Sequence, residues 1–441
     1  MSRQESYDDE MDRREYRRAR RKRNQLIAII TVVIIGIALV AAGILCVTQI
    51  MKRVNEKKQA EELQEQLEQL AEAEPAVVEA PEEEEEETPE LTSEDYLDQI
   101  ADTCIAEMSL ENKVAGLFMI TPEALTGVDT VIQAGDTTKE KLSEYPVGGL
   151  VYFDRNIESA DQLKEMLDTV NNTMIYPIFL AVDEEGGSVS RVAGAGLAED
   201  VGDMSEIGKT CDPEKAKEVG TTIGSYLSEL GFNVDFAPVA DVASVDDSTI
   251  GTRSFGSDPN VVASMVSAEV QGLQDSGVSA CLKHFPGIGD TTTDTHEEKT
   301  VSEKTMEDMQ QTDLPAFQSG IEAGVDFVMV SHMSLPNVIG DDTPCSLSGT
   351  IITDLLRNQL GYDGIVITDA LNMGAITETY SSAEAAVKAI EAGADMLLMP
   401  ENFEEAYQGV LEAVQAGTIS EDRINESLKR IYRVKYRDRI E

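Results

Sequence analysis

After residue 93, eight short apolar runs alternate with longer stretches of helical period, and this alternation constrains the fold more than any other feature of the chain. Strands and helices in this order form parallel sheets, because a parallel strand can begin only after a crossover connection that is usually a helix. Eight such units predict an α/β fold, a single (β/α)8 TIM-like barrel over residues 93–441. The predicted strands are residues 116–120, 148–153, 178–183, 233–239, 279–284, 325–332, 364–369 and 394–400.

Polar or ionisable residues stand at the ends of five of these runs. In a β/α barrel the carboxyl ends of the strands open at one mouth, so residues far apart in sequence would face one pocket. One polar residue could equally mark the point where a strand stops, but five such ends together favour a site. The residues are Asp183 with Glu184 and Glu185, Asp241, Lys283 with His284, Ser331 with His332, and Asp369.

The N-terminal region predicts a membrane anchor. No residue between Arg23 and Lys52 is charged, and residues 26–49 are dominated by Ile, Val, Leu and Ala, long enough to cross the roughly 30 Å hydrocarbon core as a helix. Segment 1–25 carries more arginine and lysine beside this run than the segment after it, which predicts a cytoplasmic N-terminus and an exported remainder. A cleaved signal peptide fits less well, because its apolar core is typically about 7–15 residues long. We therefore expect a single-pass protein of the cell membrane with an extracytoplasmic barrel.

Residues 50–92 are predicted to form a stalk. The first part is charged and helix-favouring, with Leu63, Leu67 and Leu70 at coiled-coil-like spacing over only about two heptads, too few to predict an oligomer. The second part contains prolines and the glutamate run 82–87, and it lacks the apolar residues needed to offset chain entropy. We expect a short helix followed by a disordered acidic linker.

The charge and the cysteines narrow the possible partners and covalent links. The formal net charge of −48 at pH 7 repels phosphate backbones, so we expect no nucleic-acid partner. The cysteines after the apolar run show no short-spaced framework, and we interpret them as mostly buried free thiols while leaving a pairing open. They are Cys104, Cys211, Cys281 and Cys345.

The most distinctive motif is Lys283-His-Phe-Pro-Gly-Ile-Gly-Asp-Thr-Thr-Thr-Asp-Thr-His296. A predicted strand leads into it, and two glycines and a proline demand an irregular path before a polar loop. Asp294 and His296 flank one threonine, so their side chains can lie on the same side of an extended loop. There the carboxylate would orient the imidazole and raise its basicity, which predicts a proton donor and acceptor near neutral pH.

Further motifs follow a fixed order along the chain: Asp183-Glu-Glu-Gly-Gly-Ser-Val-Ser-Arg191, Gly231-Phe-Asn-Val-Asp-Phe-Ala-Pro-Val-Ala-Asp-Val242, Ile250-Gly-Thr-Arg-Ser-Phe-Gly-Ser-Asp-Pro259, Ile367-Thr-Asp-Ala-Leu-Asn-Met373 and Ala392-Gly-Ala-Asp-Met-Leu-Leu-Met-Pro400. Together with the polar loop they resemble bacterial β-N-acetylhexosaminidases of glycoside hydrolase family 3. The resemblance spans nearly all of residues 93–441, which it identifies as the catalytic barrel.

The resemblance implies a retaining, exo-acting enzyme that hydrolyses terminal β-linked N-acetylglucosamine from cell-wall or other glycans. Asp369 matches the nucleophile that attacks the anomeric carbon. His296 would protonate the leaving oxygen and then deprotonate the incoming water, and Asp294 would support it in both steps. Glycosidases more often employ two carboxyl groups, so this subgroup would be an exception that still passes through a covalent, retaining intermediate.

The resemblance also assigns sugar-hydroxyl binding to Asp183, Arg191, Arg253, Lys283 and His284. From the residues alone, Arg253 or Lys283 could instead close a structural ion pair, and His284 could be a hydrogen-bonded core histidine. The chain departs from the family pattern at Ile288, where a second histidine is frequent, and at Ser188, where an arginine often follows the two glycines. We expect the first change to alter loop packing and the second to remove one ligand contact or loop tether.

Other functions remain as alternatives: a β-glucosidase or glycoside phosphorylase of the same family, or a non-catalytic, membrane-anchored barrel that binds glycans. The three histidines lack metal-ligand spacing and no phosphate-cradling glycine loop is present, so we expect neither a metal nor a cofactor. His332 could line the pocket or make a structural hydrogen bond. The expected partners are a carbohydrate and, through the N-terminal helix, the membrane; the oligomeric state is left open.

Overall fold

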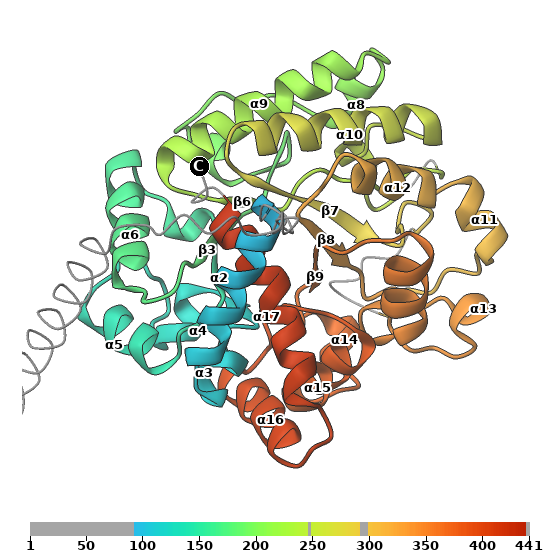
Figure 1. The fold of residues 1–441 in the computed structure, drawn as a ribbon. Helices are drawn as coiled ribbons and strands as arrows, with labels where there is room; N and C mark the ends of the chain where they lie inside the picture. Colours follow the sequence, from blue (N-terminus) through green and yellow to red (C-terminus); the bar gives the residue numbers. More distant parts are fainter. Residues whose placement is uncertain (1–91, 246–247, 292–298, 438–441) are drawn as a thin grey trace, which may run out of the picture. The chain divides into compact units, whose positions relative to one another are not determined.

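Eight short parallel strands are paired in the order β10, β1, β2, β3, β6, β7, β8 and β9. The computed structural model describes residues 92–245, 248–291 and 299–437 (Figure 1). The strands are β1 (Phe118–Ile120), β2 (Gly149–Tyr152), β3 (Phe179–Val182), β6 (Val234–Asp235), β7 (Ser279–Phe285), β8 (Phe327–Val330), β9 (Ile365–Thr368) and β10 (Leu397–Leu398). Each overlaps one of the eight predicted strands, so the predicted strand set is confirmed.

The two ends of this sheet approach each other. An isolated parallel bridge joins Ile367 of β9 to Met396 beside β10, and the Thr368 backbone N–H donates to the Met396 carbonyl at 3.1 Å. The eight strands therefore form a nearly closed barrel, consistent with the predicted TIM-like fold. Every residue of β1, β2, β3, β8 and β9 is buried, as expected for parallel strands covered by helices outside and filled with side chains inside.

Seven of the eight observed strands are shorter than predicted, for example β6, whereas β7 extends one residue beyond its predicted end. Only Val234 and Asp235 of the predicted strand 233–239 form a regular strand. Pro238 lies in the same run and has no backbone N–H to donate to a neighbouring strand, which interrupts regular pairing. Hydrogen bonding to β7 nevertheless continues: the Ala237 carbonyl accepts the Cys281 backbone N–H at 2.7 Å, and an isolated bridge joins Val239 to Lys283.

Helices surround the strands in Figure 1 and supply the crossovers between them. Several begin at a residue whose side chain caps the helix. The Ser109 hydroxyl, for example, accepts the Asn112 backbone N–H at 3.3 Å at the start of α3. The α-helices are α2 (Ser93–Glu107), α3 (Leu110–Ala115), α4 (Pro122–Thr126), α5 (Asp136–Glu144), α6 (Ala160–Thr173), α7 (Arg191–Gly194), α8 (Met204–Gly208), α9 (Pro213–Leu230), α10 (Pro259–Asp275), α11 (Met306–Gln311), α12 (Leu314–Glu322), α13 (Pro336–Ile339), α14 (Gly374–Thr377), α15 (Ser382–Ala392), α16 (Phe403–Gln415) and α17 (Glu421–Tyr436). A π-helical segment, η4 (Thr350–Gln359), follows the short 3-10 turn η3 (Cys345–Leu347).

The last helix, α17, packs against the barrel through an apolar stripe. Ile424, Leu428 and Ile431 are fully buried, and Val434 is half-buried. Figure 1 shows α17 (red) running beside α2 (blue), and the two helices contact each other. The first and last helices of the described chain thus cover one side of the barrel together.

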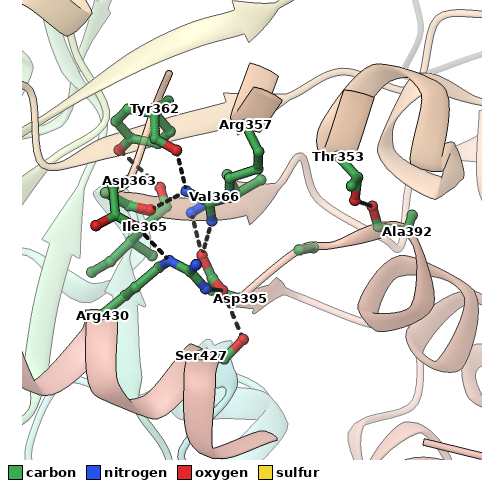
Figure 2. A network of polar contacts seen from close by, with 12 residues as sticks. Thr353, Arg357, Tyr362, Asp363, Ile365, Val366, Ala392, Asp395, Ser427 and Arg430 are labelled. Atoms are coloured by element: carbon green, nitrogen blue, oxygen red, sulfur yellow. Dashed lines mark hydrogen bonds and ion pairs between the residues drawn. The ribbon is translucent and has the colours of Figure 1, made fainter. Parts of the chain in front are cut away.

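A buried carboxylate, Asp395, ties α17 and η4 to the start of β9 (Figure 2). Its Oδ1 accepts the Ser427 hydroxyl at 2.7 Å and lies 3.3 Å from the Arg430 guanidinium. Its Oδ2 accepts the Val366 backbone N–H at 2.9 Å and pairs with Arg357. Because Asp395 is completely buried, these donors replace the water that an ionised carboxylate would otherwise need.

The predicted cytoplasmic segment 1–25, membrane span 26–49 and nearly all of the stalk 50–92 lie outside the described residues. Within the part of the chain that the structure describes, no helix combines the length and apolar character needed to cross a bilayer. The anchor therefore stays a prediction from the sequence.

All four cysteines in the described residues are free thiols. Cys281 and Cys345 are buried, as predicted, and Cys104 is half-buried. Cys211 is exposed and lies, with a φ of 50°, just before the Asp212 cap of α9, so two of the four thiols are buried, fewer than the mostly buried set that was predicted.

Candidate functional site

A pocket of about 360 Å³ lies at the carboxyl ends of the barrel strands. Its apolar wall includes Val151 of β2, Met329 of β8 and Leu398 of β10. Its charged and polar lining is contributed by residues at or beyond the ends of β3, β6, β7 and β9, as the sequence predicted for strand ends that share one mouth. These lining residues include six predicted site residues, namely Asp183, Arg191, Arg253, Lys283, His284 and Asp369.

Glu185 organises the positive charges of the pocket. It lies in the short strand β4 (Glu184–Gly186), which pairs with β5 (Val189–Ser190) just after β3. Its carboxylate receives two hydrogen bonds from the Arg253 guanidinium, both 2.7 Å long, and lies 2.6 Å from Lys283 Nζ. Lys283 Nζ also donates to Asp183 Oδ1 at 2.7 Å, so two acids and two bases form one connected network.

The charges in this network stabilise one another against the effect of burial. Burial acts to raise the pKa of Glu185, but the positive charges of Lys283 and Arg253 outweigh it and lower that pKa to about 2. Burial acts to lower the pKa of Lys283, yet Asp183 and Glu185 raise it above its ordinary value. Glu185 and Lys283 therefore remain ionised at neutral pH and present charged hydrogen-bonding groups to the pocket.

Asp369 directly follows β9 and lines the pocket. Its backbone N–H donates to the Val330 carbonyl at 2.9 Å, which continues the pairing of β9 with β8 by one residue. Its Oδ1 accepts the Ala370 backbone N–H at 2.8 Å. The carboxylate is thus held by regular strand pairing rather than by a free loop, which is the position that a reacting group requires.

His284 is oriented by the fully buried carboxylate of Asp241. Asp241 Oδ2 lies 2.7 Å from His284 Nδ1 and accepts the His284 backbone N–H at 3.1 Å. The other oxygen, Oδ1, accepts the Ile288 backbone N–H at 2.8 Å. An ionised Asp241 can only accept hydrogen bonds, so it selects the tautomer with a proton on Nδ1 and leaves Nε2 of the neutral ring as an acceptor.

Arg191 reaches the pocket because Glu184 holds the start of α7. The buried Glu184 carboxylate accepts the backbone N–H groups of Val192 and Ala193 at 2.7 and 2.8 Å, and the Tyr226 hydroxyl at 2.8 Å. These bonds satisfy N–H groups that have no partner in the first turn of a helix. Arg191 is the first residue of this turn, so its position depends on Glu184.

The Arg191 guanidinium lies over an aromatic ring at the pocket wall. It stands 5.7 Å from the ring centroid of Phe153, and its NH1 is 3.5 Å from Asp154 Oδ1. Both partners belong to the segment that follows β2. The guanidinium is therefore held between a ring and an exposed carboxylate, with donors left over for a ligand.

Three residues that the sequence left open have defined surroundings. His332 is fully buried, with Nδ1 2.7 Å from Ser346 Oγ and Nε2 2.9 Å from the Ala370 carbonyl, so it makes structural hydrogen bonds beside Asp369. Ile288 is buried in the core, where its side chain contributes apolar packing. Ser188 is exposed in the turn between β4 and β5.

The predicted acid/base residues Asp294 and His296 lie outside the described residues, so their positions stay predictions. The sequence placed Glu185 and Asp241 at strand ends but assigned neither a role, whereas the geometry makes both central. A signal for Glu185 was available: in extended backbone, residues two apart point to the same side, so Glu185 shares its side with Asp183. The role of Asp241 had no comparable local signal, because its partners His284 and Ile288 are more than 40 positions away along the chain.

The acidic residues at and beside the pocket already pair with cations or accept hydrogen bonds from backbone N–H groups. Over residues 92–245, 248–291 and 299–437, no group of three or more His, Cys, Asp or Glu side chains is arranged to hold a metal ion. Asp183 and Glu185 pair with Lys283, and Asp241 holds His284 and Ile288. The expectation that neither metal nor cofactor is needed stays a prediction.

Comparison with known proteins connects this geometry to a family. The profile described as the Glycosyl hydrolase family 3 N terminal domain matches residues 109–434. The chain is 34% identical over 292 residues to a beta-hexosaminidase of Hydrogenovibrio crunogenus, which covers 65% of this chain and 81% of the relative. It is 31% identical over 325 residues to beta-hexosaminidase A of Pseudoalteromonas piscicida, covering 67% of this chain but 54% of that longer relative.

A solved structure agrees with the sequence relatives. The glycoside hydrolase family 3 beta-N-acetylglucosaminidase from Paenibacillus sp. str. FPU-7 superposes with a TM-score of 0.70 at 36% sequence identity. The match covers 76% of this chain and 63% of the Paenibacillus chain. The chain thus spans less than two thirds of the length of two of these three proteins.

Proposed function

Because the chain belongs to glycosyl hydrolase family 3, we propose that it is a retaining, exo-acting β-N-acetylhexosaminidase that hydrolyses terminal β-linked N-acetylglucosamine. One observation carries the proposal: Asp369, at the end of β9, shares a single pocket with the connected set Asp183, Lys283, Glu185 and Arg253. A nucleophilic carboxylate beside fixed, charged hydrogen-bonding groups suits attack on a bound sugar. The beta-hexosaminidase and beta-N-acetylglucosaminidase relatives support the choice of an N-acetylhexosamine.

In the proposed reaction Asp369 attacks the anomeric carbon. A C–O bond forms to the carboxylate as the glycosidic C–O bond breaks, and His296 gives its proton to the departing oxygen. Water then attacks the same carbon, loses its proton to His296 and releases Asp369, so the configuration is retained after two inversions. Asp294 keeps the imidazole oriented and stabilises its protonated form.

The pocket residues have the chemistry needed to hold the sugar. Lys283, Arg253 and Arg191 offer charged donors and Asp183 offers a charged acceptor, which suit hydroxyls that both donate and accept. Glu185 keeps Lys283 and Arg253 in place before a ligand arrives, which lowers the ordering cost of binding. A pocket of about 360 Å³ suits one terminal sugar, in keeping with exo action.

The proposed location follows from the sequence of the N-terminal region. We propose that residues 26–49 anchor the protein in the cell membrane, with the N-terminus cytoplasmic and the barrel extracytoplasmic, where peptidoglycan fragments are the nearest N-acetylglucosamine-containing substrate. The uncharged apolar run and the basic residues before it support this orientation. Protease treatment of intact cells should release the barrel; recovery of the full chain in the cytosolic fraction would contradict it.

The test of the activity uses the full chain and chromogenic β-glycosides. We expect faster turnover of the N-acetyl-β-glucosaminide than of the β-glucoside or β-xyloside, with the β-anomer as the first product by NMR. Asp369→Ala and His296→Ala should lower kcat/KM by at least about a thousandfold and a hundredfold, respectively, on a substrate whose leaving group needs protonation. Comparable turnover in all three proteins would refute the assigned roles.

The alternatives give different results in the same assay. Preference for the β-glucoside would identify a β-glucosidase, and phosphate-dependent release of a sugar 1-phosphate would identify a phosphorylase. Glycan binding without turnover by the unmodified chain would identify a non-catalytic barrel.

A further inference from the structure

Residues on either side of segment 292–298, which carries Asp294 and His296, are joined by a charged contact that the proposed reaction does not use. Asp290 precedes the segment, and its Oδ2 accepts the Ser302 hydroxyl from the far side at 2.6 Å. Lys304 Nζ lies 3.3 Å from Asp290 Oδ1 and 2.7 Å from Asp313 Oδ2. These four residues, Asp290, Ser302, Lys304 and Asp313, form what we call the Asp290–Lys304 clasp.

The clasp is shielded from solvent, so its charges attract each other more strongly than surface pairs do. The Lys304 side chain is only 13% exposed and that of Asp313 is completely buried. Burial raises the pKa of Asp313, and the positive charge of Lys304 opposes this shift. An ammonium group between two carboxylates at this depth is screened less by solvent than an exposed pair, and removing it leaves buried carboxylates without their charge partner.

The clasp is packed against the turn that begins the distinctive motif. A Cβ at Gly287, whose φ is +121°, would lie 2.6 Å from Asp313 Oδ1, so only glycine leaves room for the buried carboxylate. Asp313 directly precedes α12, which anchors it to the barrel. Between β7 and Asp290 the chain therefore packs at Gly287 directly against Asp313.

The barrel also holds the chain immediately next to the segment. On one side the Thr249 backbone N–H donates to the Thr291 carbonyl at 3.0 Å. On the other side the Ser302 backbone N–H donates to the Ser334 carbonyl at 3.0 Å, and the Ser334 N–H donates to the Thr300 carbonyl at 2.8 Å. These neutral bonds place each end separately, whereas the clasp joins the two ends to each other.

We propose that the Asp290–Lys304 clasp is a positioning device for the general acid/base, with Lys304 as its central positioning residue. The inference rests on the proposed function, because it assigns the proton transfer to His296. Asp290 and Ser302 are 12 positions apart, and joining them restricts the conformations open to the intervening backbone. Proton transfer requires an approach within hydrogen-bond reach, and a displacement of about 1 Å can cost roughly a hundredfold in rate.

The test compares two leaving groups, because a misplaced general acid matters only where the leaving oxygen needs a proton. The full chain and its Lys304→Met and Asp290→Asn variants are assayed on N,N′-diacetylchitobiose and on the 2,4-dinitrophenyl N-acetyl-β-glucosaminide. The value of kcat/KM reports the step in which the glycosidic bond breaks. We expect a fall of roughly 10- to 100-fold on chitobiose and of less than about threefold on the dinitrophenyl substrate, with Lys304→Arg restoring most of the loss.

Lys113→Met is the matched control. Lys113 Nζ pairs with Glu421 at 2.6 Å, and its side chain is 8% exposed, so this variant also removes a shielded ammonium group. Its pair joins α3 to α17 and does not flank the motif, so both substrates should respond equally. Thermal unfolding of every variant shows whether it is folded at the assay temperature.

The outcomes separate the clasp from the proposed reaction. If His296→Ala discriminates between the two substrates but Lys304→Met and Asp290→Asn affect both equally, the clasp proposal is overturned while the proposed function stands. If His296→Ala also affects both substrates equally, the assignment of the acid is wrong and the clasp proposal falls with it. Should Lys304→Met fail to fold, Asp290→Asn, which leaves the Lys304–Asp313 pair intact, decides the question.

Discussion

Lys283 Nζ lies 2.6 Å from Glu185 Oε1, and the two side chains are only 3% and 1% exposed. Such a pair is costly to bury, and it persists here because each charge has a second partner, Asp183 for the lysine and Arg253 for the glutamate. The arrangement holds the two cations, Lys283 and Arg253, at the pocket through carboxylate partners in place of water. Breaking the Lys283–Glu185 pair should therefore lower the free energy of unfolding by a measurable amount.

Replacing Glu185 by glutamine should destabilise the protein and weaken substrate use together. The change leaves Lys283 and Arg253 with one carboxylate between them, and removing one partner of a buried pair typically costs about 3–5 kcal/mol. Urea unfolding measures the loss, and kcat/KM should fall because both cations lose their fixed positions. Glu206→Gln, which breaks only the exposed pair with Lys209, should change stability by less than about 1 kcal/mol. Equal stability of the two variants would contradict the assignment.

The lowered pKa of Glu185 also predicts how the free energy of unfolding depends on pH. The pKa of Glu185 is lowered from 4.5 to about 2 in the folded state, so its stabilising contribution is complete above about pH 4.5 and disappears as the pH falls through 2. The corresponding free energy is about 3 kcal/mol. The difference in unfolding free energy between the unmodified chain and Glu185→Gln should therefore shrink over this range; a difference that stays constant would count against it.

Glu269, on α10, should show the opposite dependence. Burial, with a smaller contribution from the negative charge of Glu185, raises its pKa to about 8, and its carboxylate has no hydrogen-bond partner among the described residues. The folded protein thus keeps this proton between about pH 4.5 and 8 while the unfolded chain releases it, so stability falls as the pH rises. Glu269→Gln removes this dependence, and its stability relative to the unmodified chain should increase by up to about 5 kcal/mol across that range. Urea unfolding of both proteins at pH 5, 7 and 9 measures the trend. If their unfolding free energies change with pH in parallel, the raised pKa of Glu269 is refuted.

Glu184→Gln should act on the site through Arg191. The substitution places an amide NH2 against backbone N–H groups of α7, so one of the bonds to Val192 or Ala193 is lost. A loss of about 1–2 kcal/mol in holding Arg191 corresponds to roughly a tenfold rise in KM. Tyr226→Phe removes only the hydroxyl that donates to the same carboxylate and should have the smaller effect. The reverse order would exclude this route to Arg191.

Asp395→Asn should lower stability without changing the chemistry. The variant leaves Arg357 and Arg430 near a neutral side chain in a buried site, which we expect to cost about 3–5 kcal/mol. Because Asp395 does not line the pocket, kcat/KM of the folded fraction should stay unchanged. Asp363→Asn, which removes the exposed partner of Arg430, provides the control and should cost less than about 1 kcal/mol. A specific loss of activity in Asp395→Asn would show that this network reaches the pocket.

The strands and several site positions were accessible from the sequence because they depend on local order. Apolar runs of strand length, separated by helical stretches, identified all eight barrel strands, and the rule that parallel strand ends share one mouth brought Asp183, Lys283 and Asp369 together. The cap at Ser109 and the apolar stripe of α17 were equally local. Most strand lengths were overestimated, as at Pro238, because an apolar run does not reveal where backbone pairing stops.

The partners of the buried charges were decided by the tertiary structure alone. Glu185 meets Arg253 across 68 positions and Asp241 meets His284 across 43, and no periodic pattern encodes such distances. The pairings exist because closing the barrel excludes water. A buried ion without water is stabilised by an opposite charge, and the neighbouring strands decide which one lies within reach. The sequence determined which residues reach the mouth of the barrel; three-dimensional packing determined which of them hold one another, and so which remain available to a substrate.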